Sequence, residues 1–168
     1  MPQAGAVMRA YLAPLLLLLA AFPLSGPRAA ERLAGPVEAE VLRVIDGDSM
    51  VVRARIWLGQ TVETHVRLSG IDTPELRGKC AEEKERAAAA RDALALLVAE
   101  GAVRLSDVET DKYGGRVLAR VATLRHGDLA STLIAAGHAR AYEGGARGGW
   151  CRLAATLPLE VPERPSAE

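Results

Sequence analysis

The sequence has few aromatic residues and no excess of either charge. Aromatic side chains make up 4% of the 168 residues, so the core has to be built mainly from Ala, Val, Leu and Ile. The 21 basic residues are balanced by 21 acidic ones. A protein that binds nucleic acid or an anionic membrane non-specifically is usually basic, so any anion-binding site in this chain must be local.

Metal-binding side chains with nitrogen or sulfur donors are also scarce. The three histidines, His65, His126 and His138, show no spacing typical of metal ligands. Two cysteines without clustered histidines make a poor zinc site. In an exported protein such a pair is typical of a disulfide, and we predict that Cys80 and Cys151 are bonded to each other.

The N-terminal segment has the pattern of an export signal. An apolar run from Ala10 to Phe22 follows a lone Arg9, and it is too short to span a membrane comfortably. We therefore expect residues 1–30 to be a signal peptide and the protein to be periplasmic or secreted. Arg28 stands where a small residue is preferred for cleavage, which leaves an uncleaved membrane anchor as the alternative.

The rest of the chain shows strand and helix patterns in a simple order. Segments rich in valine and isoleucine are separated by turns and predict strands, whereas an alanine-rich segment predicts a long helix. The expected elements are strands over 37–45, 49–59 and 61–71, a helix over 78–101, strands over 102–109 and 116–124, and a helix over 127–137. This order predicts an α+β, mainly β protein: a five-stranded OB-fold barrel with a helix between strands 3 and 4 and a short helix after strand 5.

Capping residues and a helical face support this assignment. Gly101 and Gly137 stand where helix C-caps favour glycine, and Asp128 is placed to cap the second helix at its N-terminus. The apolar face of the long helix should consist of Ala87, Ala90, Leu94, Leu97 and Val98. These signals indicate where the two helices begin and end.

The same patterns set the expected limits of the domain. One domain is expected over 36–153, with "HARAY" at 138–142 as a last short extended piece. Prolines and scattered acids in 158–168 are typical of a disordered tail. The sequence shows no repeats and no second domain.

Four acidic residues fall at predicted strand ends: Asp46 and Asp48 in "IDGDS", and Asp72 and Glu75 in "IDTPE". The first and third strands can be neighbours in a small barrel, so we expect the two segments to converge. Gathered carboxylates repel one another unless a hard cation neutralises them, and oxygen ligands favour calcium over zinc or copper. Taken alone, Asp-Gly is a common turn and Thr-Pro-Glu a common start of a helix.

Two arginines complete the candidate site. Arg67 alternates with Val66 and Leu68 and so faces the other side of the sheet, and Arg116 follows "DKYGG" at the start of the fifth strand. Guanidinium groups match phosphate oxygens bidentately, so the two could hold a phosphodiester beside the cation. Taken alone, either arginine is more simply explained as a solvated residue, and only their combination with the acids indicates a site.

Three stretches, "VIDGDS", "VRLSGIDTPE" and "DKYGGRVLA", resemble in order and spacing the signature stretches of the staphylococcal nuclease (thermonuclease) family. The resemblance runs from about Val41 to Tyr142. It implies a role for each matched residue: Asp48, Asp72 and the carbonyl of Thr73 hold calcium, Glu75 activates the attacking water, Arg67 and Arg116 hold the scissile phosphate, and Lys112 and Tyr113 lie near a bound terminal phosphate.

The sequence departs from the family pattern at three places. Ser49 replaces a threonine, and Gly115 is an additional residue before Arg116 that can redirect its side chain. The segment "YEGGARGGWC" replaces the aromatic loop that flanks the nucleotide in the family. Contacts of Tyr142 or Trp150 with a base are therefore not carried over.

The leading interpretation is an exported, monomeric, calcium-dependent nuclease that hydrolyses DNA and RNA. One alternative is a non-catalytic OB-fold module that binds nucleic acid, which would be expected to lack one of Arg67, Glu75 or Arg116. None of the three is missing. The other alternative, suggested by the even charge balance, is a calcium-stabilised envelope protein with no role in nucleic-acid chemistry.

Overall fold

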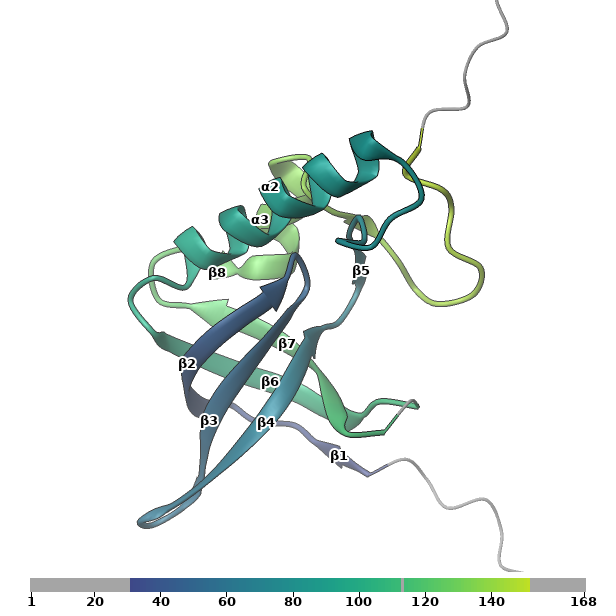
Figure 1. The fold of residues 1–168 in the computed structure, drawn as a ribbon. Coiled ribbons are helices and arrows are strands. Elements are labelled where there is room, and N and C mark those ends of the chain that lie inside the picture. The colour runs from purple at the N-terminus through teal and green to yellow at the C-terminus, as the bar shows by residue number, and fades with distance from the viewer. Residues whose placement is uncertain (1–30, 113, 152–168) are drawn as a thin grey trace, which may run out of the picture. The chain divides into compact units, whose positions relative to one another are not determined.

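The structure is a computed structural model that describes residues 31–112 and 114–151. Five long strands form a sheet: β2 (Val37–Asp46), β3 (Ser49–Trp57), β4 (Gln60–Leu68), β6 (Ala102–Thr110) and β7 (Arg116–Thr123). Their order in the sheet is β6-β2-β3-β4-β7, and β6 also pairs with β7. This last pairing closes a barrel, in which β4 and β7 are parallel (Figure 1). The predicted α+β, mainly β OB-fold barrel is confirmed.

Shorter elements complete the fold. They are β1 (Arg32–Leu33), β5 (Ile71–Asp72), α2 (Ala81–Leu97), β8 (Gly127–Asp128), α3 (Leu129–Ala135) and β9 (Arg140–Ala141). Strand β1 was not predicted, because two residues are too few for a periodic pattern. Strand β5 overlaps the end of the strand predicted over 61–71, and β8 lies within the predicted second helix. The extended piece expected over 138–142 is present as β9, which pairs antiparallel with β5.

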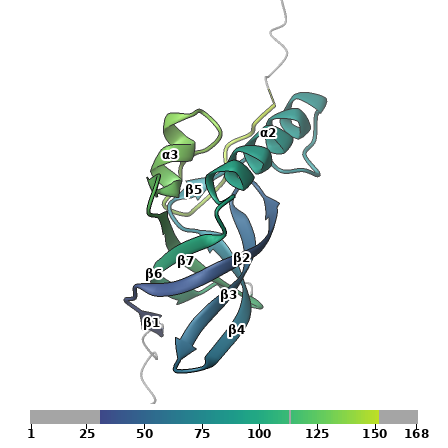
Figure 2. The same cartoon turned by 90° about the vertical axis from the view of Figure 1, so that its left-hand side faces the viewer.

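The two helices lie at the same end of the barrel (Figure 2). Helix α2 begins and ends three to four residues inside its predicted limits. At its start, the Glu83 side chain accepts a hydrogen bond from the backbone N–H of Lys79 at 2.9 Å, and Cys80 is the N-cap with an extended backbone. At its end Val98 is the C-cap, and the predicted cap Gly101 instead closes the following turn with φ +79°.

Helix α3 is capped as predicted. The backbone N–H of Ser131 donates to Asp128 Oδ1 at 2.9 Å, and Gly137 has φ +76° just after the helix ends. None of the helices in the described part of the chain is long and apolar enough to cross a membrane. The predicted signal peptide (1–30) and disordered tail (158–168) lie outside the described residues.

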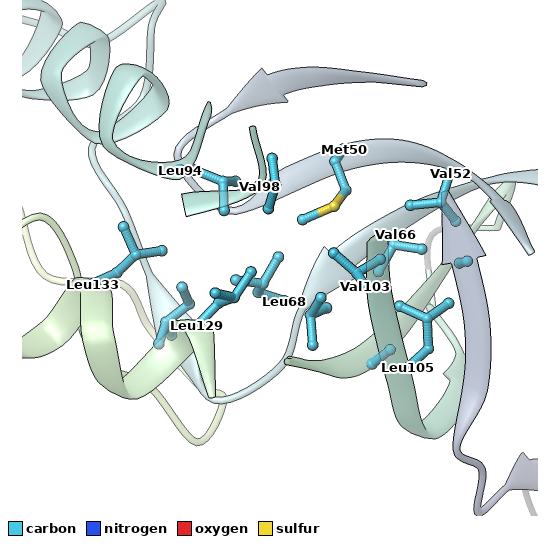
Figure 3. Packing of buried hydrophobic residues seen from close by; sticks show 14 of the residues in the cluster. Met50, Val52, Val66, Leu68, Leu94, Val98, Val103, Leu105, Leu129 and Leu133 are labelled. Carbon is cyan, nitrogen blue, oxygen red and sulfur yellow. The ribbon is translucent and has the colours of Figure 1, made fainter. Parts of the chain in front are cut away.

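The core is aliphatic, as the shortage of aromatic residues predicts. Figure 3 shows Met50, Leu68 and Val103 of the barrel packed near Leu94 and Leu129 of the helices. On the predicted inner face of α2, four of the five residues are buried, and Leu97 is only partly buried. Packing between the barrel and α2 therefore fixes the position of the segment that enters the helix.

Two leucines of α2 give a direct test of this packing. Leu94 is fully buried and Leu96 is 77% exposed. We expect Leu94→Ala to lower the free energy of unfolding by about 2–5 kcal/mol and Leu96→Ala to change it by less than about 0.5 kcal/mol. Urea denaturation followed by circular dichroism measures both, and equal losses would contradict the packing of α2.

Candidate functional site

The turn between β2 and β3 brings the first acidic segment against the second. A Cβ atom added at Gly47 would lie 2.7 Å from the Cβ of Ala90 in α2 and 3.2 Å from the Cβ of Thr73. The backbone N–H of Asp48 donates to Asp46 Oδ1 at 3.3 Å. Glycine at this position therefore allows the turn to approach Thr73, and Asp48 follows directly.

The two acidic segments converge by a route that differs from the predicted one. The first and third strands are not neighbours, because β3 lies between β2 and β4. Instead, Ser49 at the start of β3 pairs with Arg67 near the end of β4. The backbone N–H of Leu68 donates to the carbonyl of Asp48 at 2.8 Å. A hairpin turn and the end of the next strand thus meet at one end of the barrel.

Asp48 is a buried carboxylate with few partners. It is 2% exposed, its Oδ1 accepts a hydrogen bond from Ser49 Oγ at 2.7 Å, and its Oδ2 lies 2.6 Å from Arg67 Nη1. Burial raises the pKa of Asp48 to about 7, against the lowering effect of Arg67, and the neighbouring Asp46 raises it further. One arginine is therefore not enough to offset the desolvation, and additional positive charge would favour the ionised form.

Asp72 is buried more deeply, and its two oxygens differ. Oδ2 accepts hydrogen bonds from Arg140 Nε at 3.0 Å, from Arg140 Nη2 at 2.6 Å and from Trp150 Nε1 at 3.1 Å. Oδ1 is buried and, within the described residues, has no hydrogen-bond partner, although Arg147 Nε lies 3.4 Å away. The side chain is thus held by one oxygen while the other remains available as a ligand.

Thr73 and Glu75 extend the acidic side of the site. Thr73 is 4% exposed and lies beside the Gly47 turn, whereas the side chain of Glu75 is 54% exposed and forms an ion pair with Arg147. Asp72, Thr73, Glu75 and Arg147 line one cleft. Two of the predicted metal ligands and the predicted base therefore line one cleft, whereas Asp48 is not among the described residues that line it.

Arg67, the partner of Asp48, lines a second cavity. It is 9% exposed, and its Nη2 is buried without a hydrogen-bond partner among residues 31–112 and 114–151. The second cavity has a volume of ≈ 470 Å³ and is lined in part by Arg67, Lys112, Tyr142 and Arg147. Three basic residues outnumber the two acidic ones that also line the cavity, Asp111 and Glu143, so it is suited to an anion.

Arg116 is not among the described residues that line this cavity, but its ion-pair partner is. The Nε of Arg116 forms an ion pair with Asp111, which lines the cavity with Arg67. Both Gly114 and Gly115 have φ +68°, so the additional glycine is accommodated in a turn that precedes β7. Of the two weaker candidates, Lys112 lines the cavity, and Tyr113 lies outside the described residues.

Two residues of the site, Arg140 and Arg147, were not found from the sequence. Both belong to the end of the chain that follows α3, where no motif marks them. Arg140 stands opposite Asp72 in the β5–β9 pair, and its guanidinium lies 4.3 Å from the ring centroid of Trp150. Trp150 thus contacts both partners of this ion pair: its ring lies under the Arg140 guanidinium, and its Nε1 donates to Asp72.

The predicted disulfide between Cys80 and Cys151 is confirmed. It ties the segment 142–151 to the start of α2, and Figure 1 shows this segment running beside β5 to reach the helix. Glu83 lies close to both sulfurs, with its Oε2 at 3.5 Å from Cys151 Sγ. Because the two sulfurs are bonded to each other, this cluster does not offer thiolate ligands to a metal.

The closed barrel defines an OB-fold protein, with buried acids and arginines at one end next to an anion-binding cavity. A comparison with protein families matches residues 65–148, half of the chain, to the staphylococcal nuclease homologue family. The protein belongs to this family. The matched range includes Asp72, Glu75 and Arg116, and Asp48 precedes it. A search of curated proteins gives no match.

The close approach of the turn at Gly47 can be tested with a matched pair of variants. Gly47→Ala would place a Cβ against Ala90 and Thr73, whereas Gly149→Ala meets no atom within 4 Å. We expect Gly47→Ala to lower the free energy of unfolding by about 1–3 kcal/mol and Gly149→Ala to change it by less than about 0.5 kcal/mol. Urea denaturation measures both, and a tolerated Gly47→Ala would show that the turn does not pack against α2 in this way.

Proposed function

We propose that this protein is a calcium-dependent nuclease that hydrolyses phosphodiester bonds of DNA and RNA. The family is usually one of nucleases, which supports the reaction class. The observation that carries the proposal is that the buried Asp48 is paired with Arg67, which lines the cavity with Lys112 and Arg147. The second buried carboxylate, Asp72, lies 3.4 Å from the same Arg147. Acids for a cation and arginines for a phosphate are the parts that phosphodiester hydrolysis requires.

The acidic residues fit a hard divalent cation. Asp72 Oδ1 is a buried oxygen without a hydrogen bond in the described structure, and Asp48 is buried with too little positive charge around it. With the backbone carbonyl of Thr73 they form an oxygen donor set, which suits calcium. When bound, calcium supplies positive charge that stabilises the charge developing on the phosphoryl oxygens.

The other residues act on the phosphate and on the water. Arg67 binds phosphoryl oxygens, since its Nη2 lacks a partner in the described residues and the side chain lines the cavity. Arg116 adds a second guanidinium if it exchanges Asp111 for the phosphate. Glu75 accepts the proton of the attacking water, and its exposed carboxylate at the cleft is accessible to that water.

A non-catalytic nucleic-acid-binding module is the second candidate. The observation in its favour is that two proposed catalytic side chains already have ion-pair partners, Glu75 with Arg147 and Arg116 with Asp111. If these pairs persist on a bound strand, the cavity holds phosphate and no water is activated. Hydrolysis by the wild-type protein separates the two candidates.

Export to an oxidising compartment is part of the proposal. The disulfide supports it, because disulfides persist mainly in secreted and periplasmic proteins. The apolar N-terminal segment supports it as well. The proposed form is a monomer that acts in the periplasm or outside the cell.

The role of Glu75 can be tested by Glu75→Gln, with Glu85→Gln on the exposed side of α2 as a control of the same charge change. Glutamine retains the size of the side chain but does not accept the proton. We expect turnover on single-stranded DNA with calcium to fall by roughly 10²–10⁴ for Glu75→Gln and to stay unchanged for Glu85→Gln. A wild-type protein that binds DNA but never cleaves it would leave only the binding module.

The role of Asp48 predicts a change in calcium requirement. Asp48→Asn removes one charged ligand, so the calcium concentration that gives half-maximal hydrolysis should rise by about tenfold or more. Asp92→Asn, at an exposed position of α2, should leave this concentration unchanged. The measurement is a calcium titration of the hydrolysis rate, and an unchanged midpoint for Asp48→Asn would remove Asp48 from the ligand set.

A further inference from the structure

Arg147 lies where the acidic cleft and the anion-binding cavity of the proposed site meet. Its Nη1 forms an ion pair with Glu75 Oε1, and its Nε lies 3.4 Å from Asp72 Oδ1. It also lines both hollows, the acidic cleft with Thr73 and Glu75 and the anion-binding cavity with Arg67 and Lys112. No other arginine among the described residues lines both.

The electrostatic surroundings of Arg147 agree with this position. Burial lowers the pKa of Arg147, and the carboxylates of Glu75, Asp72 and Asp48 raise it, so that it lies above its ordinary value. The guanidinium is thus within the field of all three acidic side chains of the site. A cation there offsets the repulsion among the acids and is close to any anion that enters the cavity.

The segment that carries Arg147 is fixed at both ends. At one end the backbone N–H of Tyr142 donates to the carbonyl of Gly70 at 2.9 Å, next to the β5–β9 pair. At the other end Cys151 is bonded to Cys80. Between them, Arg140 Nη1 donates to the carbonyl of Gly149 at 3.3 Å. These contacts hold a glycine-rich loop over the acids, although it has no regular secondary structure.

The second guanidinium in the cavity is that of Arg147. Arg67 and Arg147 both line the cavity, whereas Arg116, which is bound to Asp111, is not among the described residues that line it. Two guanidinium groups on one cavity can each match a pair of phosphoryl oxygens. Arg147 is also ion-paired with Glu75. A phosphate bound by Arg147 would therefore lie next to the proposed base.

We propose that Arg147 binds the scissile phosphate together with Arg67 and keeps the Glu75 carboxylate beside it. This inference rests on the proposed nuclease function and adds a substrate-binding residue from outside the three signature stretches. The disulfide and β9 serve the reaction indirectly, because they set the position of Arg147. The reacting strand would therefore pass between β4 and the loop 142–151.

The test compares Arg147→Ala and Arg147→Lys with Arg125→Ala, whose side chain is 71% exposed and paired with Glu100. The full-chain protein binds a fluorescent single-stranded oligonucleotide in chelator over a series of salt concentrations, and its kcat/KM is measured with calcium. Circular dichroism checks that each variant is folded. Arg125→Ala controls for the loss of a positive charge that lies outside the described site.

We expect Arg147→Ala to weaken oligonucleotide binding and to lower kcat/KM, each by about 10- to 100-fold, the usual effect of a hydrogen bond to a charged group. The slope of log affinity against log salt should become shallower by about 0.7, the contribution of one phosphate contact on a single strand. Arg147→Lys keeps the charge without the bidentate geometry and should lose less than the alanine variant. Arg125→Ala should behave as the wild type.

The outcomes separate this inference from the proposed function. If the wild type cleaves and folded Arg147→Ala retains its affinity and salt slope, Arg147 does not bind phosphate and the inference is overturned. If the wild type does not cleave, the nuclease proposal fails, and the affinity and slope in chelator still decide whether Arg147 contacts the strand. If Arg147→Ala does not fold, the same comparison with Arg147→Lys decides, because an unchanged affinity and kcat/KM would overturn the inference.

Discussion

The burial of Asp72 is the constraint on which the site depends. A carboxylate that is 1% exposed is costly unless it is paired and hydrogen-bonded, and Arg140 and Trp150 provide that pairing on one oxygen. Both partners lie in the last part of the described chain, 68 and 78 residues away in sequence. The contacts of Asp72 therefore hold the segment that contains Arg140 and Trp150 at the end of the barrel. Arg147 belongs to the same segment and is held there as well.

The barrel and the disulfide make this arrangement geometrically possible. The hairpin of β2 and β3 places Asp48 against the end of β4, and α2 packs on the barrel through an aliphatic face. The disulfide then ties the start of α2 to the far end of the segment 142–151. Fold and site are thus coupled. If the segment 142–151 were released, Asp72 would become exposed and the guanidinium group of Arg147 would move away from the acids.

The sequence was sufficient to predict the barrel and the acidic residues. The strands follow a local periodicity, and the acids and Arg67 fall within motifs short enough to be read from neighbouring residues. The reason given for convergence was wrong, since β3 separates the first and third strands of the meander. The two acidic segments meet instead because the turn before β3 lies beside the end of β4, its hairpin partner.

The roles of Arg140 and Arg147 could not be predicted for a different reason. They lie among glycines without periodicity, and their partners Asp72 and Glu75 are distant in sequence, so no local spacing connects them. The neighbouring Cys151 was the one available signal, because a disulfide to Cys80 places this segment near the start of α2. Long-range ion pairs of this kind become visible only in three dimensions.

In the proposed mechanism, Asp48 and Asp72 together hold a cation beside the phosphate-binding arginines. Calorimetric titration of calcium into the purified full-chain protein measures this binding, with Asp72→Asn as the comparison. We expect one calcium site per chain in the wild type and a large loss of affinity in the variant. A wild-type protein that binds no calcium, or an Asp72→Asn variant that binds it equally well, would show that the two aspartates do not form a calcium site.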